Sequence, residues 1–332
     1  MAEVFITTQA FPEAISRLAE AGHEVRITDK EGLSREDLLA GVEEADAVVC
    51  LLADRIDKEL FLRANRLKVV ANLGVGVDNI DLDAATRDGV AVTNTPDVLT
   101  ETTADLGWAL MMAAARRIVE ADEHLRRHGF PGWTFMPPHM GVDVYGSTLG
   151  VVGPGRIGSA VARRAAGFSM NVLYHARSQK PQLERELGAS RASMDELLSR
   201  SDFVVLCVPL TDETEHMIGR RELSLMKGTA ILVNIARGPV VDEAALVEAL
   251  RAGRPRAAGL DVYEREPEVH PGLLGLSNAV LTPHIGSATE ATRKKMAHLA
   301  VDGVLAVLEG RRPPNLVNTA VKPPGDQSGR PV

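Results

Sequence analysis

The chain of 332 residues contains little cysteine and few aromatic residues, and it has no excess of positive charge. Aromatic residues make up 4% of the chain, whereas the whole hydrophobic set makes up 45%. The 37 Lys and Arg are outnumbered by 45 Asp and Glu, and the resulting net charge of −8 disfavours non-specific attraction to nucleic acid or to anionic membranes. We therefore expect no nucleic-acid partner, and any anionic ligand must be bound by a local site.

The scarcity of cysteine and of long apolar runs bears on the compartment. Cys50 and Cys207 lie inside apolar, strand-like runs, which favours small buried hydrophobic side chains over a disulfide. The N-terminus lacks a basic stretch followed by an apolar one, and no segment offers the roughly 18 uncharged apolar residues of a membrane span. We expect a cytoplasmic protein with no membrane partner.

Short aliphatic runs indicate two α/β domains. Over the first 94 residues they alternate with amphipathic stretches, the rhythm of a parallel sheet, and the rhythm restarts at Thr148 with six further strand candidates. We predict two doubly wound parallel-sheet domains. A Rossmann dinucleotide-binding domain over residues 101–286 is inserted into a flavodoxin-like substrate domain formed by residues 1–100 and 287–332.

Helical patterns mark the expected connections between these domains. Thr100 is predicted to cap one long helix that extends to about residue 129 and forms a hinge, and residues 287–310 predict a closing helix of at least five turns. The tail from Lys322 is too polar and too rich in Pro and Gly to order itself. We expect a ligand cleft between the domains, because small-molecule sites commonly lie there.

A glycine pattern follows the first strand candidate of the inserted domain. Gly153, Gly155 and Gly158 match G-x-G-x-x-G directly after "TLGVV" and at the start of a helical segment. In that context the glycines permit a tight turn, close approach of a pyrophosphate, and close packing of helix on strand. The pattern therefore predicts a bound dinucleotide.

The end of the next strand candidate bears on the choice of dinucleotide. An Asp or Glu at this point would bind the ribose hydroxyls of NAD, but the strand ends in His175, Ala176, Arg177 and Ser178. A guanidinium beside a hydroxyl is suited to a phosphate, and Lys180 adds positive charge. We predict NADP(H) as the preferred cofactor and keep NAD(H) as a second one; the alternative is a merely solvated basic turn.

Three later strand candidates are followed by reactive side chains, namely Arg237, Glu266 and His284. Carboxyl ends of parallel strands share one sheet edge, so we expect these side chains to converge. Reduction of a 2-oxo acid needs a cation for the carboxylate and carbonyl and a proton donor for the developing alkoxide, roles that suit Arg237 and His284. Glu266 would hold the imidazole in its charged form. Taken singly, each residue is equally compatible with a packed or solvated structural role.

Five segments together resemble the D-isomer-specific 2-hydroxyacid dehydrogenase family, and most of all its glyoxylate and hydroxypyruvate reductases. They are "GVGVDNID", "VVGPGRIG", "ARGPVVDEAAL", "GLDVYEREP" and "TPHIGSAT", in the order and approximate spacing of the family and over nearly the whole chain.

The resemblance implies further site residues. The backbone N–H groups of Val75 and Gly76 would hold the substrate carboxylate, Asp261 would face the nicotinamide carboxamide, and Ser287 would assist near His284. The implied cofactor contacts extend to Thr103, Arg156, Ile157, Pro209, Thr214, Ile235 and Gly286. No metal is implied.

A homodimer is also implied, with Trp133 reaching the partner's active site; from the sequence alone, Trp133 could equally pack its own loop. Other activities within the family remain as alternatives. Phosphite oxidation uses a lysine where Val75 stands, which argues against it, and formate oxidation lacks support. Reduction of 2-ketogluconate and a dinucleotide-sensing corepressor without catalysis stay open, and the motifs do not specify which 2-oxo acid is preferred.

Overall fold

The computed structural model describes residues 1–28 and 32–321. It divides into two compact units, one formed by Met1–Leu99 with Ala288–Val332 and the other by Thr100–Ser287, and each is described by itself. We refer to them as unit 1 and unit 2. The predicted disorder of the tail from Lys322 lies outside the described residues.

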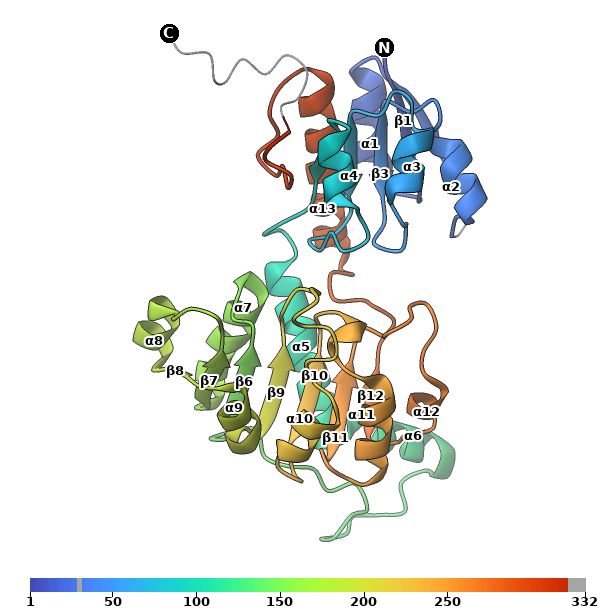
Figure 1. Cartoon of the computed structure of the whole chain (residues 1–332). Coiled ribbons are helices and arrows are strands. Elements are labelled where there is room, and N and C mark those ends of the chain that lie inside the picture. Colours follow the sequence, from blue (N-terminus) through green and yellow to red (C-terminus); the bar gives the residue numbers. More distant parts are fainter. Residues whose placement is uncertain (29–31, 322–332) are drawn as a thin grey trace. The chain divides into compact units, whose positions relative to one another are not determined.

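Unit 1 contains a five-stranded parallel sheet covered by helices (Figure 1). Its strands, in the spatial order β2-β1-β3-β4-β5, are β1 (Glu3–Ile6), β2 (Glu24–Ile27), β3 (Ala47–Cys50), β4 (Val69–Asn72) and β5 (Ala91–Thr93). Its helices are α1 (Pro12–Glu20), α2 (Arg35–Val42), α3 (Lys58–Arg63), α4 (Leu82–Arg87) and α13 (Glu290–Leu308).

The two faces of this sheet bury separate apolar layers. On one face, Leu18 of α1 and Val304 of α13 pack with Val4 and Val69, and all four side chains are fully buried. Helices α2, α3 and α4 cover the other face. Strands buried on both faces are continuous aliphatic runs rather than alternating ones, which is why the sequence pattern located them.

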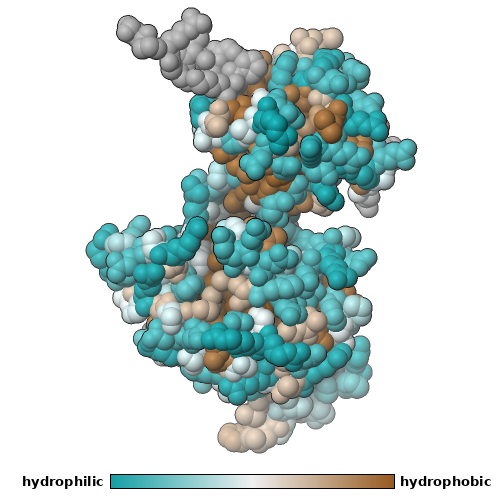
Figure 2. All heavy atoms as spheres, in the orientation of Figure 1, coloured by the Kyte–Doolittle hydropathy of each residue, from teal (hydrophilic) through white to brown (hydrophobic). Residues whose placement is uncertain are grey.

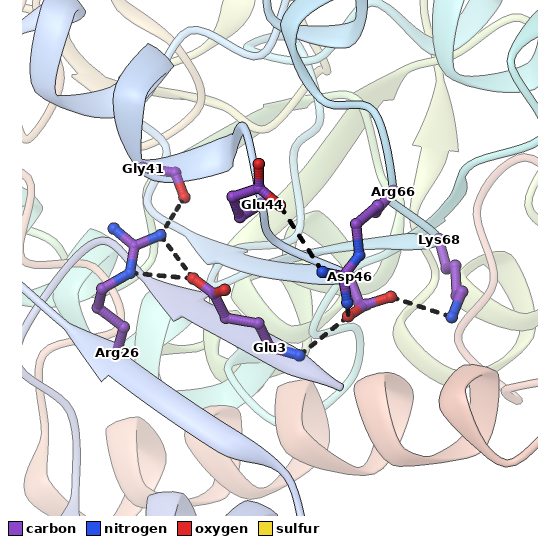
Figure 3. Close-up of polar contacts among 7 residues, drawn as sticks. All are labelled: Glu3, Arg26, Gly41, Glu44, Asp46, Arg66 and Lys68. Carbon is purple, nitrogen blue, oxygen red and sulfur yellow. Dashed lines mark hydrogen bonds and ion pairs between the residues drawn. The ribbon is translucent and has the colours of Figure 1, made fainter. Parts of the chain in front are cut away.

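A buried carboxylate fixes the amino-terminal edge of the sheet in unit 1 (Figure 3). Asp46 accepts hydrogen bonds from the backbone N–H of Glu3 at 3.0 Å, from Arg66 at 2.6 Å and from Lys68 at 3.0 Å. Burial opposes ionisation of Asp46, but these donors hold its pKa below the ordinary value. The Glu3 side chain in turn accepts from Arg26 at 2.8 Å, which links β1 and β2. This polar cluster lies at the edge opposite the strand ends that carry the candidate site.

Unit 2 contains a seven-stranded parallel sheet in the order β12-β11-β10-β9-β6-β7-β8. The strands are β6 (Thr148–Val152), β7 (Asn171–His175), β8 (Ser190–Arg191), β9 (Phe203–Leu206), β10 (Ile231–Asn234), β11 (Ala257–Leu260) and β12 (Ala279–Leu281). The helices are α5 (Thr100–Arg116), α6 (Ile118–His128), α7 (Arg156–Arg164), α8 (Pro181–Leu187), α9 (Met194–Arg200), α10 (Arg220–Leu225), α11 (Glu243–Arg251) and α12 (Pro271–Leu274).

The strand order reverses at β6, from which the chain first winds towards β8 and then returns through β9 to β12. This is the topology of a Rossmann domain, and such sheets bind ligands beyond the carboxyl ends of the strands at the reversal. Figure 1 shows α9, α10 and α11 on the near face of the sheet and α5 behind it. The prediction of two doubly wound parallel-sheet α/β domains is confirmed.

The prediction of one long helix from Thr100 was wrong. Thr100 is the first residue of α5 rather than its cap, and the helix breaks at Arg117, whose φ of 51° lies in the left-handed region. The break has a tertiary cause, because the N–H of Val142 donates to the carbonyl oxygen of Ala115 at 2.9 Å. The approach is so close that a Cβ on Gly141 would lie 2.3 Å from that same oxygen.

Other local predictions met mixed outcomes. Strand β8 was not expected, since two exposed residues leave no hydrophobic pattern. The closing helix is present as α13, and the Thr289 hydroxyl caps it by accepting from the Thr292 N–H at 3.3 Å.

Cys50 and Cys207 are both free thiols, and burial raises the pKa of Cys207 to about 12. Among the helices of the described residues, none has the length and apolar composition needed to cross a membrane.

Candidate active site

The glycine turn between β6 and α7 has the shape that a dinucleotide requires. Gly153 has a φ of 83°, a left-handed conformation that favours glycine. A Cβ on Gly155 would meet nothing within 4 Å, whereas a Cβ on Gly158 would lie 2.4 Å from the carbonyl oxygen of Gly153. Gly155 therefore leaves room for a ligand, and Gly158 lets α7 pack closely against the turn.

The amino end of α7 is suited to an anion. Gly155 is its N-cap and offers no capping side chain, and Arg156 and Ile157 open the helix. The first N–H groups of a helix lack partners within the helix and carry partial positive charge. A pyrophosphate placed there satisfies them, so this turn fits the group that the motif predicts.

The predicted phosphate grip occupies the exposed loop after β7. Arg177 and Ser178 are both exposed, and His175 ends the strand. The charge of Arg177 contributes to lowering the pKa of Glu213, behind the larger effect of the hydrogen bond from Thr211. Arg177 therefore lies near the loop that follows β9.

That loop also contains two of the expected cofactor residues. The Thr214 hydroxyl donates to the carbonyl oxygen of Pro209 at 2.7 Å and accepts from the N–H of Thr211 at 2.8 Å. Thr214 thus closes a turn directly beyond the strand end and keeps Pro209 beside it.

The chemical centre lies at the carboxyl ends of the neighbouring strands β11 and β12. Nδ1 of His284 is 2.8 Å from Oε2 of Glu266, and because a carboxylate only accepts, Nδ1 carries the hydrogen. The other carboxylate oxygen accepts from the N–H of Tyr263 at 3.0 Å. Both oxygens of Glu266 are therefore occupied, which fixes the orientation of the imidazole and leaves Nε2 available to a ligand.

The electrostatics of the pair favour an ionised carboxylate. Burial opposes ionisation of Glu266, but the hydrogen bond to His284 and the charge of that imidazole hold the pKa of Glu266 below its ordinary value. The positive charge of Arg237 acts in the same direction. The structure thus brings Arg237, Glu266 and His284 within electrostatic reach of one another.

The backbone beneath His284 is strained and firmly held. Its φ of 51° lies in the left-handed region, which is uncommon for a residue other than glycine. The N–H of His284 donates to the carbonyl of Asp261 at 2.9 Å. The side chain of Asp261 accepts from the N–H groups of Ile285 and Gly286, each at 2.8 Å, and from the Thr282 hydroxyl at 2.7 Å. Asp261 therefore anchors the whole turn that carries the imidazole.

The environment of Asp261 differs from that of Glu266. Asp261 is 2% exposed, and burial raises its pKa despite the hydrogen bonds it accepts. A Cβ on Gly286 would lie 3.2 Å from the Asp261 carboxylate and 3.3 Å from the Thr103 side chain, so these three expected cofactor residues lie together. Ile235, at the end of β10, packs over the helix that carries Thr103, where a Cβ on Gly107 would lie 2.8 Å from it.

Arg237 is positioned by the turn after β10. The Asn234 side chain donates to the carbonyl of Arg237 at 2.9 Å and accepts from the Ala236 N–H at 3.0 Å. Gly238 touches the loop that carries Glu266, since a Cβ there would overlap the Tyr263 carbonyl at 1.8 Å. Only glycine permits this approach, which brings the guanidinium turn beside the loop of Glu266.

The predicted carboxylate-binding loop, Val75 and Gly76, follows β4 in unit 1. The Asn72 side chain donates to the carbonyl of Gly76 at 2.7 Å, and the Asn94 side chain donates to the carbonyl of Val75 at 2.7 Å. Both carbonyls are thereby engaged by side chains, which fixes the backbone of the loop that carries the N–H groups of Val75 and Gly76. Sequence reasoning missed these two asparagines, although both stand at strand ends.

Two predicted residues remain to be placed. Ser287 is half-buried at the end of unit 2, and Trp133 is 82% exposed in the loop after α6, with its ring 6.4 Å from that of Phe135. Within residues 1–28 and 32–321, no group of three or more His, Cys, Asp or Glu is arranged to hold a metal ion.

Comparison with known proteins gives one consistent result. Residues 108–286 match the family model described as D-isomer specific 2-hydroxyacid dehydrogenase, NAD binding domain. The chain is 52% identical to the glyoxylate reductase of Thermococcus onnurineus, over 95% of this chain and 96% of that one, and 50% identical to the glyoxylate reductase of Aeropyrum pernix, over 96% of each.

Solved structures agree with this result. A protein from Thermus thermophilus has a TM-score of 0.90 at 48% identity, with 95% of this chain and 99% of that chain covered. An NADPH-dependent glyoxylate/hydroxypyruvate reductase from Sinorhizobium meliloti, in complex with NADP and malonate, has a TM-score of 0.84 at 31% identity, with 97% and 98% covered. The resemblance seen in the sequence is confirmed: the chain belongs to the family of D-isomer-specific 2-hydroxyacid dehydrogenases, whose nicotinamide-dinucleotide-binding domain it contains.

Proposed function

We propose that the protein reduces a small 2-oxo acid, either glyoxylate to the achiral glycolate or hydroxypyruvate to the D-2-hydroxy acid, and that it prefers NADPH as the reductant. The hydrogen bond of 2.8 Å between Glu266 and His284 carries the proposal, since it joins a proton donor to a carboxylate that orients the ring and stabilises positive charge on it. The family and the glyoxylate reductases at about half identity support the substrate class.

Each residue of the proposed active site has a separate role in the reaction. When bound, the cofactor supplies a hydride to the carbonyl carbon. Nε2 of His284 donates a proton to the carbonyl oxygen as negative charge develops there, and Glu266 stabilises the imidazolium beforehand. Arg237 offers paired N–H donors to the carboxylate and the carbonyl oxygen. The N–H groups of Val75 and Gly76 bind the substrate carboxylate, and Ser287 assists close to His284.

The glycine turn and the sheet edge supply the cofactor site. Gly153, Gly155 and the first turn of α7 would hold the pyrophosphate, and Arg177 with Ser178 would hold the 2′-phosphate of NADP. Asp261 would bind the nicotinamide carboxamide, and the other contacts would come from Thr103, Arg156, Ile157, Gly158, Pro209, Thr214, Ile235 and Gly286. The preference for NADP rests on a cationic side chain where an NAD-specific site has a carboxylate.

A substrate screen tests the activity. We expect glyoxylate or hydroxypyruvate with NADPH to give the highest kcat/KM among glyoxylate, hydroxypyruvate, pyruvate and 2-ketogluconate, each tested with both cofactors. Lack of turnover with all four would contradict the reductase proposal and favour a dinucleotide-sensing protein. Preference for NADH that is unchanged in Arg177→Ala would contradict the phosphate grip alone.

We further propose a homodimer. Residues 118–145 expose an unusual number of large apolar side chains, and soluble monomers rarely leave so many uncovered. Pale brown atoms at the lower end of Figure 2 belong to this end of unit 2. The exposed side chains are Ile118, Val119, Leu125, Phe130, Trp133, Phe135, Met136, Met140 and Tyr145.

Sedimentation analysis of the wild type and of Phe135→Asp tests the dimer; we expect a dimer that dissociates on substitution, and a monomeric wild type would contradict it. Trp133→Ala tests the proposed contact with the partner's active site, because a changed KM at unchanged oligomeric state supports it and an unchanged KM argues against it.

A further inference from the structure

The loop between β7 and α8 accepts hydrogen bonds from an arginine that lies outside the loop and outside the sequence motifs. Arg191 lies on β8 opposite Tyr174 of β7 in the parallel register. Its guanidinium donates to the carbonyl of Ala176 from Nε at 3.2 Å and from Nη2 at 2.9 Å, and the same Nη2 donates to the carbonyl of Arg177 at 3.0 Å. One exposed side chain therefore engages two consecutive carbonyls at the start of this loop.

These carbonyls matter because the loop is the proposed phosphate grip. Carbonyl oxygens carry partial negative charge and would repel a phosphate, whereas N–H groups and cationic side chains attract one. A guanidinium that engages the carbonyls of Ala176 and Arg177 orients them towards β8. The loop is thereby left to present the side chains of Arg177 and Ser178.

The far end of the loop is fixed as well. The N–H of Lys180 donates to the hydroxyl of Tyr174 at 2.9 Å, and that hydroxyl donates to Glu184 at 2.5 Å. Tyr174 is fully buried, so its hydroxyl is a rigid attachment point. The five residues from Ala176 to Lys180 are thus anchored at both ends, and the exposed Arg191 is the anchor beside Arg177.

The charges around this loop also favour the binding of a phosphate. Arg191 of β8 brings a positive charge to the backbone of Arg177, and Lys180 is a second cation within the loop itself. The anionic neighbour on the other side is Glu213, which belongs to the loop after β9 and whose carboxylate accepts from the Thr211 hydroxyl at 2.8 Å. A phosphate monoester at Arg177 competes with that carboxylate, and each added cation on the loop favours the phosphate.

We propose that Arg191 is a specificity-determining residue for the cofactor: it positions Arg177 and Ser178 and adds positive charge for the 2′-phosphate of NADPH. The proposal rests on the proposed preference for NADPH and extends it to a residue on a different strand. Arg191 is a positioning residue here, since it acts through the loop rather than on the reacting atoms.

The test is equilibrium binding of the cofactors to Arg191→Met, which keeps the aliphatic stem and removes the donors and the charge. We expect the Kd of NADPH to rise about tenfold, while the Kd of NADH stays within about twofold. Arg191→Lys restores the charge without the paired N–H donors of a guanidinium. We expect its Kd for NADPH to lie between those of the wild type and Arg191→Met. Binding of 2′-AMP should weaken like NADPH, and binding of 5′-AMP should be unaffected.

Arg200→Met is the matched control, since it removes an exposed arginine from the neighbouring helix α9 and should leave both Kd values unchanged. Equal weakening of NADPH and NADH in Arg191→Met would indicate a general structural role and overturn the proposal, as would no change at all. Arg177→Met separates failure of the role of Arg191 from failure of the proposed NADP preference. If it weakens NADPH binding and Arg191→Met does not, only the role of Arg191 fails; if neither variant matters and the wild type prefers NADH, the NADP preference fails with it.

Discussion

Replacing Glu266 by Gln removes the charge beside His284 while keeping a side chain of the same shape. The amide oxygen can still accept from Nδ1, but the amide nitrogen then faces the N–H of Tyr263, so the substitution removes one hydrogen bond along with the charge. The two groups are 2.8 Å apart at the hydrogen bond, and their side chains are 30% and 37% exposed. Solvent therefore screens the pair strongly, and the appropriate effective dielectric is nearer to that of water than to that of a protein interior.

Two unit charges about 4 Å apart interact by about 1 kcal/mol in water and about 4 kcal/mol at an effective dielectric of 20. For a pair this exposed we take about 1 to 2 kcal/mol, which corresponds to roughly a tenfold change in rate. The carboxylate stabilises positive charge on the imidazole, and the Gln side chain does not. We expect kcat/KM for glyoxylate reduction to fall about tenfold in Glu266→Gln.

The assay is glyoxylate reduction followed by NADPH absorbance from about pH 5 to about pH 10. Glu268→Gln is the matched control, because it removes an exposed carboxylate from the same loop and should leave the profile unchanged. A profile of Glu266→Gln that overlays the wild type in position and height would refute the role of Glu266.

Three further outcomes are expected. His284→Ala should lose roughly 10² to 10⁴ in kcat at unchanged NADPH binding, because the proton donor is removed, and near-normal turnover would contradict this. Asn94→Asp removes the donor to the Val75 carbonyl and should raise the KM for glyoxylate about tenfold with a smaller effect on kcat; a changed kcat with a constant KM would argue against it. Asp46→Asn should lower the free energy of unfolding at neutral pH by about 1 to 2 kcal/mol, since its partners are partly exposed, as measured by urea denaturation. Because the pKa of Asp46 is lower in the folded protein than in the unfolded chain, this contribution is present above the unfolded value of about 3.9 and is lost as the pH falls through the folded value, so wild type and variant should converge in acid.

The fold was predictable because its central strands are buried on both faces. Runs such as Ala47–Cys50 and Ile231–Asn234 are buried along their whole length and aliphatic up to the last residue, and they appear in the sequence as short blocks between amphipathic helices. Strand β8 consists of two exposed residues and leaves no such block. Its presence depends on pairing with β7, which is a tertiary contact.

The break between α5 and α6 was not predictable for the same reason, because it depends on a tertiary contact. Helical periodicity continues through Arg117, and no Pro or Gly lies at the break. The interruption comes from Val142, whose N–H replaces an intrahelical donor to the Ala115 carbonyl. A contact made by a distant loop has no counterpart in the local pattern.

At the site, position at strand ends predicted which reactive groups meet. Glu266 and His284 follow adjacent strands, and the structure has them in hydrogen-bonding contact. The supporting residues were not predictable in the same way. Asn72, Asn94 and Arg191 act on backbone carbonyls of other segments, and neither a buried amide nor an exposed arginine is distinguishable in the sequence from many others.

The most direct test of the proposed active site is a crystal structure with NADP⁺ and oxamate, an unreactive analogue of a 2-oxo acid. We expect Nε2 of His284 and a nitrogen of Arg237 each to lie within hydrogen-bonding distance of the analogue, about 2.7 to 3.2 Å, with the pyrophosphate on the turn of Gly153 and Gly155. An analogue bound elsewhere, with His284 and Arg237 both beyond about 5 Å, would contradict it.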